Sequence, residues 1–161
     1  SDFFCGSAMK AIPAAAMSLF FQKNPFMLYS GQEFGEKGMD KEGFSGRDGR
    51  TTIFDYWSPE TLTHAYQEGE EEAYTAEQKY LAATYRQLLR LANEEKALRE
   101  GDTFDLMYVN PAPAGFDPRP LFAFLRKKDI EVMLIVTTFA QEARQLTVCF
   151  PGHAFDFLPI T

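Results

Sequence analysis

The pattern of apolar and polar residues first predicts a helix and then a short buried strand. Residues 8–21 are rich in Ala and Met, and the regular helix is expected to start at Pro13, since proline is tolerated in the first turn. Residues 25–29 follow as an uncharged apolar run that ends before Gly31. Such a run is typical of a strand buried on both faces of a parallel sheet. The first hundred residues offer almost no partner for it, so either it is not a strand or it belongs to a larger sheet.

The clearest helix is predicted over residues 76–98. Thr75 and Gln78 form a capping-box pattern at its start, and Gly101 is a natural terminator. Apolar positions repeat at helical spacing and define a buried face. These positions are Leu81, Tyr85, Leu88, Leu89 and Ala92. Between the two predicted helices, the Gly-rich residues 34–58 favour a long loop.

After Gly101 the period becomes that of strands joined by short turns, which predicts an antiparallel sheet. Lys127 to Asp129 form the expected hairpin turn, and a domain boundary is expected near Gly101. The predicted strands are residues 104–109, 121–126, 130–139, 145–150 and 155–160.

Charge and composition narrow the classes of partner. The chain has 161 residues and a formal net charge of −7, which disfavours nucleic acid, since phosphate binding requires a basic face. No apolar run is long enough to cross a bilayer, so no membrane partner is expected. Cys5 and Cys149 are expected to be free thiols, and His153 a turn residue beside a glycine. His64 and Glu68 have an i, i+4 spacing that could bind a metal, but the pattern offers no third ligand, so no metal site and no cofactor are expected.

Two ordered segments resemble a known enzyme family. Residues 25–33, followed by residues 43–57, resemble the end of the catalytic barrel in the α-amylase family, glycoside hydrolase family 13. There the eighth strand typically reads Gly-x-Pro-hydrophobics-Tyr-x-Gly-Gln-Glu, and Asn24 stands in place of the first Gly. Residues 121–126 and 132–139 resemble the start of the β-sandwich that follows that barrel, with Thr138 where the family often has Asn.

The resemblance implies an α+β fold in two parts. Residues 1–101 would carry the last strand and helix of a (β/α)8 barrel, and residues 102–161 a partial antiparallel β domain. A complete barrel takes roughly 250 residues, which this chain cannot hold. The family's catalytic Asp, Glu and second Asp all precede the eighth strand. No residue of this chain therefore matches a catalytic position, and the chain alone is expected to be inactive.

Five residues are candidates for contacts or structural roles. Arg50, Asp55 and Trp57 follow the expected strand and are weak candidates for sugar contacts, although a loop ion pair and a buried aromatic anchor are the plainer alternatives. Gly31 and Glu33 are expected to be structural, with the Glu33 carboxylate paired with a nearby Arg or backbone amide. The competing hypothesis makes Glu33 and Glu36 an acid pair at the strand end, where barrel active sites are built.

Three functions are compatible with these patterns. The first is a C-terminal portion of an amylase-like hydrolase, whose parent cleaves α-glucosidic links of starch-like glucans by a retaining double displacement. The second is a non-catalytic carbohydrate-binding module using Trp57 and neighbouring aromatic residues. The third is a purely structural domain. In each case, apolar faces without their barrel partners predict self-association.

Overall fold

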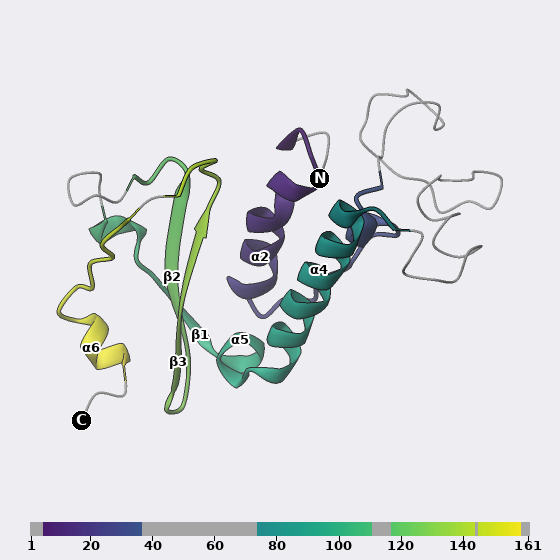
Figure 1. The fold of residues 1–161 in the computed structure, drawn as a ribbon. Helices are drawn as coiled ribbons and strands as arrows, with labels where there is room; N and C mark the ends of the chain where they lie inside the picture. The colour runs from purple at the N-terminus through teal and green to yellow at the C-terminus, as the bar shows by residue number, and fades with distance from the viewer. Residues whose placement is uncertain (1–4, 37–73, 111–116, 144, 159–161) are drawn as a thin grey trace, which may run out of the picture. The chain divides into compact units, whose positions relative to one another are not determined.

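The computed structural model describes residues 5–36, 74–110, 117–143 and 145–158, which form two compact units (Figure 1). The first unit comprises residues 1–12 and 26–87, and the second residues 13–25 and 88–161. Helices and an antiparallel sheet occur together, which confirms the α+β class at this level. The helices are α2 (Ile12–Phe20), α4 (Ala76–Glu94), α5 (Lys96–Glu100) and α6 (Ala154–Phe157); the strands are β1 (Asp102–Asp105), β2 (Leu121–Lys128) and β3 (Glu131–Thr138).

The N-terminal helix is confirmed. A 3-10 turn, η1 (Met9–Ala11), leads directly into α2, and Pro13 is the second residue of that helix. Proline fits there because a first-turn N–H has no partner within the helix. The buried residues of α2 are Ala15, Ala16, Leu19 and Phe20.

The predicted buried strand at residues 25–29 is wrong. The segment forms no β-ladder, and the sheet contains only β1, β2 and β3. Met27 is 79% exposed, and Tyr29 is exposed as well. A strand requires a neighbour that takes its backbone hydrogen bonds, and the described residues offer none to this segment. An apolar run is thus insufficient to make a strand.

The long predicted helix is two helices with a break at Glu95, which has extended backbone angles of φ −81° and ψ 119°. Its start is confirmed in detail. The Gln78 N–H donates to Thr75 Oγ1 at 3.2 Å, and the Thr75 N–H donates to Gln78 Oε1 at 2.8 Å. This reciprocal pair is the capping box that the sequence indicates.

Gly101 ends α5, but for a reason that differs from the expected one. Its φ is −72°, so no left-handed conformation is involved. A Cβ at this position would lie 2.2 Å from the carbonyl oxygen of Ala97 and 2.6 Å from that of Lys127. Glycine is therefore required because α5 and β2 approach each other too closely for any side chain.

The sheet has the order β1-β2-β3, and both pairings are antiparallel. In the hairpin, Leu121 pairs with Thr138 and Lys128 with Glu131. The predicted hairpin is confirmed, with its two-residue loop at Asp129 and Ile130, two positions beyond the expected start. Asp129 has φ 53°, a left-handed conformation that Asp tolerates better than most residues.

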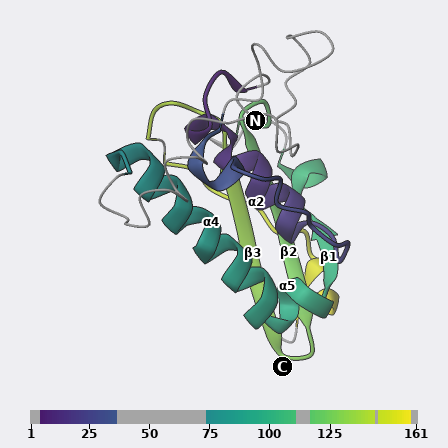
Figure 2. The same ribbon diagram turned by 90° about the vertical axis from the view of Figure 1, so that its right-hand side faces the viewer.

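Each face of the sheet carries its own set of contacts. Because side chains alternate along a strand, Leu121, Ala123 and Leu125 lie on one face and pack in a cluster that includes Phe157 of α6. On the other face, the ring of Phe21 contacts Phe122 and Phe124 edge to face. Helix α5 lies near the hairpin end of β2 and β3 (Figure 2), where the Ala97 N–H donates to Glu131 Oε1 at 2.7 Å.

Three strand predictions near the sheet need correction. The strand expected at residues 104–109 is only the end of β1, and a 3-10 turn, η4 (Met107–Val109), follows it. Residues 145–150 are not a strand, although Leu146 and Val148 pack on the sheet cluster as an alternating pattern requires. Residues 154–157 form helix α6, and the rest of the expected strand at 155–160 lies mostly outside the described residues.

In place of a ladder, one side chain holds the segment at residues 145–150. The buried Asn110 donates from Nδ2 to the Cys149 carbonyl at 3.0 Å, and its Oδ1 accepts the Cys149 N–H at 2.7 Å. Its second Nδ2 hydrogen reaches the Leu106 carbonyl at 2.7 Å. The amide satisfies the backbone of Cys149 as a neighbouring strand would.

Gly101 lies within the second unit, and the domain boundary expected there stays a prediction. Of the loop expected at residues 34–58, residues 37–58 lie outside the described residues, as does the loop expected at residues 111–115.

Candidate functional site

The residues proposed from the sequence divide into two groups. Arg50, Asp55 and Trp57 lie outside the described residues, so their roles stay predictions. Gly31 and Glu33 lie in the first unit, in a tight turn that follows the apolar run. This turn is one polar site of the molecule, and the buried guanidinium of Arg126 in the second unit is the other.

The turn at residues 29–36 is built on two left-handed glycines. Gly31 has φ 82° and precedes the 3-10 turn η2 (Gln32–Phe34), and Gly35 has φ 73° and follows it. The Gly31 carbonyl accepts the N–H groups of Phe34 at 3.0 Å and Glu36 at 2.9 Å. A residue with a Cβ is disfavoured at such φ angles, which explains glycine at both ends.

Close packing adds a second constraint at Gly35. A Cβ there would lie 3.1 Å from Ala8 Cβ and 3.1 Å from Leu81 Cδ1. The turn therefore passes directly against residues that lie near η1 and on α4. The glycine fits on grounds of both conformation and space.

Gln32 ties the turn to helix α4. Its Nε2 donates to the Tyr85 hydroxyl at 2.9 Å, and its Oε1 accepts the Tyr29 N–H at 3.4 Å. Tyr85 is buried, and burial raises the pKa of its phenol from the ordinary value of 10.0, while the hydrogen bond from Gln32 partly opposes that rise. The nearby carboxylate of Glu33 raises the pKa of Tyr85 further. The neutral phenol is therefore the stable form.

Glu33 does not make the expected pairing within the described part of the chain. Its side chain is half-buried, and its Oε2 is a buried atom without a hydrogen-bond partner among the described residues. No described Arg or backbone N–H donates to that oxygen. Glu36 is also half-buried and contributes its backbone N–H to the turn. The hydrogen bonds of the turn do not join the two carboxylates as an acid pair.

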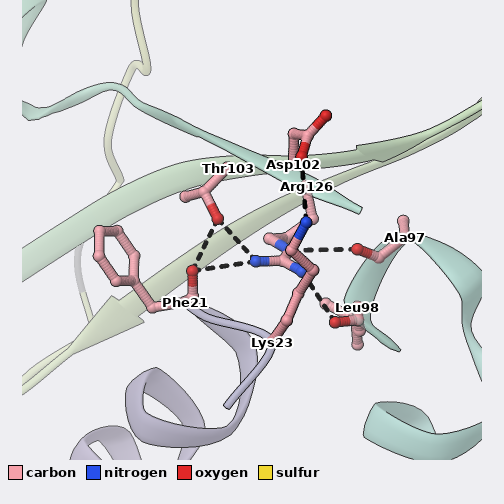
Figure 3. A network of polar contacts seen from close by, with 7 residues as sticks. All are labelled: Phe21, Lys23, Ala97, Leu98, Asp102, Thr103 and Arg126. Atoms are coloured by element: carbon pink, nitrogen blue, oxygen red, sulfur yellow. Dashed lines mark hydrogen bonds and ion pairs between the residues drawn. The ribbon is translucent and has the colours of Figure 1, made fainter. Parts of the chain in front are cut away.

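Arg126 is the most connected polar side chain of the second unit (Figure 3). It is fully buried on β2, on the face shared with Phe122 and Phe124. The guanidinium donates to the carbonyls of Ala97 at 3.1 Å and Leu98 at 2.8 Å, and to that of Phe21 at 3.0 Å. It also donates to Thr103 Oγ1 at 2.6 Å, and that hydroxyl donates in turn to the Phe21 carbonyl at 2.7 Å.

Helix ends explain how a buried cation is held there without a bonded carboxylate. The carbonyls of Ala97 and Leu98 belong to the last turn of α5, and that of Phe21 follows the last residue of α2. Carbonyls at the C-terminal end of a helix carry partial negative charge. The Ala97 carbonyl accepts the Gly101 N–H at 3.1 Å in addition to the guanidinium. Burial lowers the pKa of the Arg126 guanidinium, and the charge of Asp102 opposes this shift. Asp102 itself forms an ion pair with Lys23 at 3.2 Å (Figure 3).

The sequence did not single out Arg126 or Asn110, because both lie in or beside predicted strands, where the pattern of apolar residues is the main signal. A signal for Arg126 exists. The residue continues the alternation of Phe122 and Phe124 on one face of a predicted strand, and a charge at a core-facing position indicates a buried partner set.

Metal-binding clusters and membrane-spanning helices were both sought among the described residues. They contain no group of three or more His, Cys, Asp or Glu side chains able to hold a metal ion. Within the same ranges, no helix combines the length and the apolar character that a membrane span needs. Cys5 and Cys149 are both free thiols.

The polar groups of these two sites mainly satisfy one another or the backbone, which is typical of structural networks. Among the described residues, neither site presents a nucleophile hydrogen-bonded to a base. No protein-family model matches this chain, and no curated protein and no solved structure matches it either.

Proposed function

We propose that this chain is the C-terminal portion of an amylase-like glycoside hydrolase and serves a structural role in it. The parent enzyme cleaves α-glucosidic links of starch-like glucans by a retaining double displacement, with catalytic carboxylates that precede residue 25. The chain contributes the final helix of the barrel, the turn that precedes it and part of the following β domain. It carries no catalytic group of its own.

The observation that carries the proposal is the ordered Tyr29-Ser30-Gly31-Gln32-Glu33 motif together with its geometry. Gly31 supplies the left-handed turn, and Gln32 links that turn to Tyr85 on the next long helix. A motif that turns the chain toward the following helix suits the connection before the last helix of a barrel.

The order of elements after residue 75 supports the same interpretation. A 19-residue helix, α4, and the short α5 are followed directly by an antiparallel sheet. A barrel helix followed by an all-β domain is the arrangement that the resemblance implies.

The test has two parts. The purified chain, incubated with soluble starch, is expected to release no reducing ends above a buffer control. Turnover that persists through repeated purification, and that is lost in Glu33→Gln, would overturn the inactivity and favour Glu33 as a catalytic acid.

The second part concerns the parent. The coding sequence upstream of Ser1 is expected to encode Asn-His-Asp shortly before it, with an Asp and a Glu farther back. The longer protein is expected to hydrolyse starch and to lose activity when either of those two carboxylates is replaced by its amide. An upstream sequence without these residues contradicts the family proposal.

A further inference from the structure

Four rings meet on the second unit, on the side of the sheet that carries α6. They are Phe104 of β1, Tyr108 of η4, His153 just before α6, and Phe157 of α6. Phe104 and Phe157 are half-buried and pack on the sheet cluster. Tyr108 is 56% exposed, and His153 is exposed as well. The group therefore has a buried half and a solvent-facing half.

The two exposed rings lie side by side. The Tyr108 hydroxyl and His153 Nε2 are 2.6 Å apart, and the ring planes differ by only 29°. The ring centroids are 6.0 Å apart, within the range of offset stacked rings. Tyr108 and His153 thus form a pair of exposed, roughly parallel rings joined by a hydrogen bond.

Phe104 supports this surface. Its centroid is 5.6 Å from that of His153 and 6.4 Å from that of Tyr108, at tilts of 51° and 53°. Phe157 lies 5.3 Å from Phe104, and Lys127 Nζ lies 5.5 Å from the Phe157 ring centroid. The two exposed rings are therefore fixed by a hydrogen bond and by packing. A fixed surface loses little conformational entropy when a ligand binds to it.

We propose that Tyr108 and His153 form a glycan-binding surface on which pyranose rings stack. Exposed aromatic rings that are held in place suit the apolar C–H face of a sugar ring, whose hydrogens interact favourably with the negative faces of aromatic rings. The phenol oxygen and the imidazole edge supply polar atoms for sugar hydroxyls. Nucleic-acid bases also stack on aromatic rings, but a chain with a net charge of −7 repels their phosphates.

The preferred ligand is an α-linked glucan, a choice that rests on the proposed function, whereas the stacking surface itself does not. The site lies outside the segment of Trp57, to which the sequence assigned sugar binding. It gives the β domain a ligand-holding role in addition to its structural one.

Affinity electrophoresis of the whole chain tests the inference. Native gels containing amylopectin, hydroxyethyl cellulose or no polysaccharide are compared, and mobility is measured relative to a non-binding reference protein. The chain is expected to be retarded in the amylopectin gel. Tyr108→Ala and His153→Ala are each expected to weaken binding about tenfold, the approximate worth of one aromatic contact.

The chain offers a matched control in Tyr80, a tyrosine on α4 that is also 56% exposed. Tyr80→Ala is expected to bind like the wild type. Tyr108→Phe keeps the ring and tests the hydroxyl alone, with an expected loss smaller than that of the alanine variant. Circular dichroism of each variant confirms that it is folded.

Each outcome has a distinct meaning. Retardation in amylopectin that is lost in Tyr108→Ala and His153→Ala supports the site and its α-glucan ligand. Retardation only in the hydroxyethyl cellulose gel, lost in the same two variants, supports the binding surface but contradicts an α-glucan as its ligand. Equal mobility in all three gels overturns the site, and so does binding that both alanine variants retain. Neither result bears on the hydrolase activity of the parent, which the starch assay tests separately.

Discussion

The guanidinium of Arg126 donates to the carbonyl of Phe21, a residue 105 positions earlier in the chain, at 3.0 Å. The same side chain reaches the last turn of α5 and the hydroxyl of Thr103. One residue therefore joins the end of α2, helix α5 and strands β1 and β2. Since three of its acceptors are backbone carbonyls, the network depends on where the helices end more than on which side chains surround it.

The first prediction concerns this network. Arg126→Met is expected to lower the free energy of unfolding by roughly 3–5 kcal/mol, because it removes four hydrogen bonds of a buried cation. Arg126→Lys keeps the charge but cannot match the fork of the guanidinium, and a loss of roughly 1–3 kcal/mol is expected. Urea unfolding followed by circular dichroism measures both.

Arg119 is the control for charge and side-chain type, because its side chain is 87% exposed and forms an ion pair with the partly exposed Asp117 at 2.9 Å. Arg119→Lys is expected to leave the unfolding midpoint unchanged, since exposed ion pairs contribute little. Equal midpoints for Arg126→Met and the wild type would show that the network does not stabilise the fold.

The second prediction concerns Gly101. Gly101→Ala places a Cβ within 2.6 Å of two backbone oxygens, neither of which belongs to a flexible side chain. A loss of about 1–3 kcal/mol or more is expected, as for other overpacked sites. Gly152→Ala is the matched control, because a Cβ there meets no atom within 4 Å. If the two variants unfold at the same urea concentration, the close approach of α5 and β2 is not a constraint in solution.

The third prediction is a pH dependence that arises from Tyr85. Its pKa is raised above 10.0 in the folded protein, so the folded state keeps a proton that the unfolded chain releases. The contribution of Tyr85 to the free energy of unfolding is therefore fully present below about pH 10. It is lost as the pH rises through the pKa of Tyr85 in the folded protein. Tyr85→Phe removes this dependence, so the stability difference between wild type and variant shrinks above pH 10.

At neutral pH, Tyr85→Phe also removes the acceptor of Gln32 Nε2 and is expected to cost about 1 kcal/mol. Tyr80 lies on the exposed side of the same helix, and Tyr80→Phe is expected to change neither the stability at neutral pH nor its pH dependence. Thermal melts at intervals from pH 7 to pH 11 provide the measurement. Parallel pH profiles for wild type and Tyr85→Phe would contradict the effect of burial on this phenol.

The fourth prediction concerns self-association through β3. No described strand pairs with its outer edge, and Leu134 and Val136 are 46% and 38% exposed. Glu131 is the only charged residue of the strand, and its carboxylate already accepts the Ala97 N–H. An uncharged edge strand is prone to pair with a second copy. We therefore propose that the chain forms a dimer or a larger assembly through this edge.

Light scattering over a range of concentrations measures the assembly. Leu134→Lys combined with Val136→Lys is expected to shift the protein toward the monomer, because charges on an edge strand oppose pairing. Ile130→Lys, in the exposed hairpin loop, is the control and is expected to leave the assembly unchanged. A wild-type chain that stays monomeric at high concentration contradicts the proposal.

Local signals explain which elements the sequence predicts correctly. The Thr75–Gln78 capping box and the β2–β3 hairpin depend on residues close together in sequence, and both are confirmed. The strand expected at residues 25–29 fails because apolar character does not supply a hydrogen-bonding neighbour. The strand expected at residues 155–160 fails at its start because a short apolar run fits a helical turn equally well.

The candidate site was less predictable than the fold. Gly31 and Gln32 could be singled out by motif, but the partner of Gln32 lies 53 positions away in Tyr85. The surface of Tyr108 and His153 joins residues 45 positions apart, and neither residue stands in a recognisable pattern. Contacts over such distances depend on tertiary packing, which periodicity along the chain does not encode.

The hold of Asn110 on Cys149 has a consequence for how the chain can vary. A ladder fixes the register of every residue along a strand, whereas a single side-chain amide fixes only one position. Insertions or deletions on either side of Cys149 would therefore disturb no strand pairing, provided that the N–H and carbonyl of one residue still bind the Asn110 amide. Among homologues, the length of this segment should vary more freely than that of β2 or β3, while position 110 should remain Asn. An Asp at position 110 would lack the N–H donor for the Cys149 carbonyl. The longer Gln would place its amide nitrogen and oxygen out of reach of the Cys149 backbone.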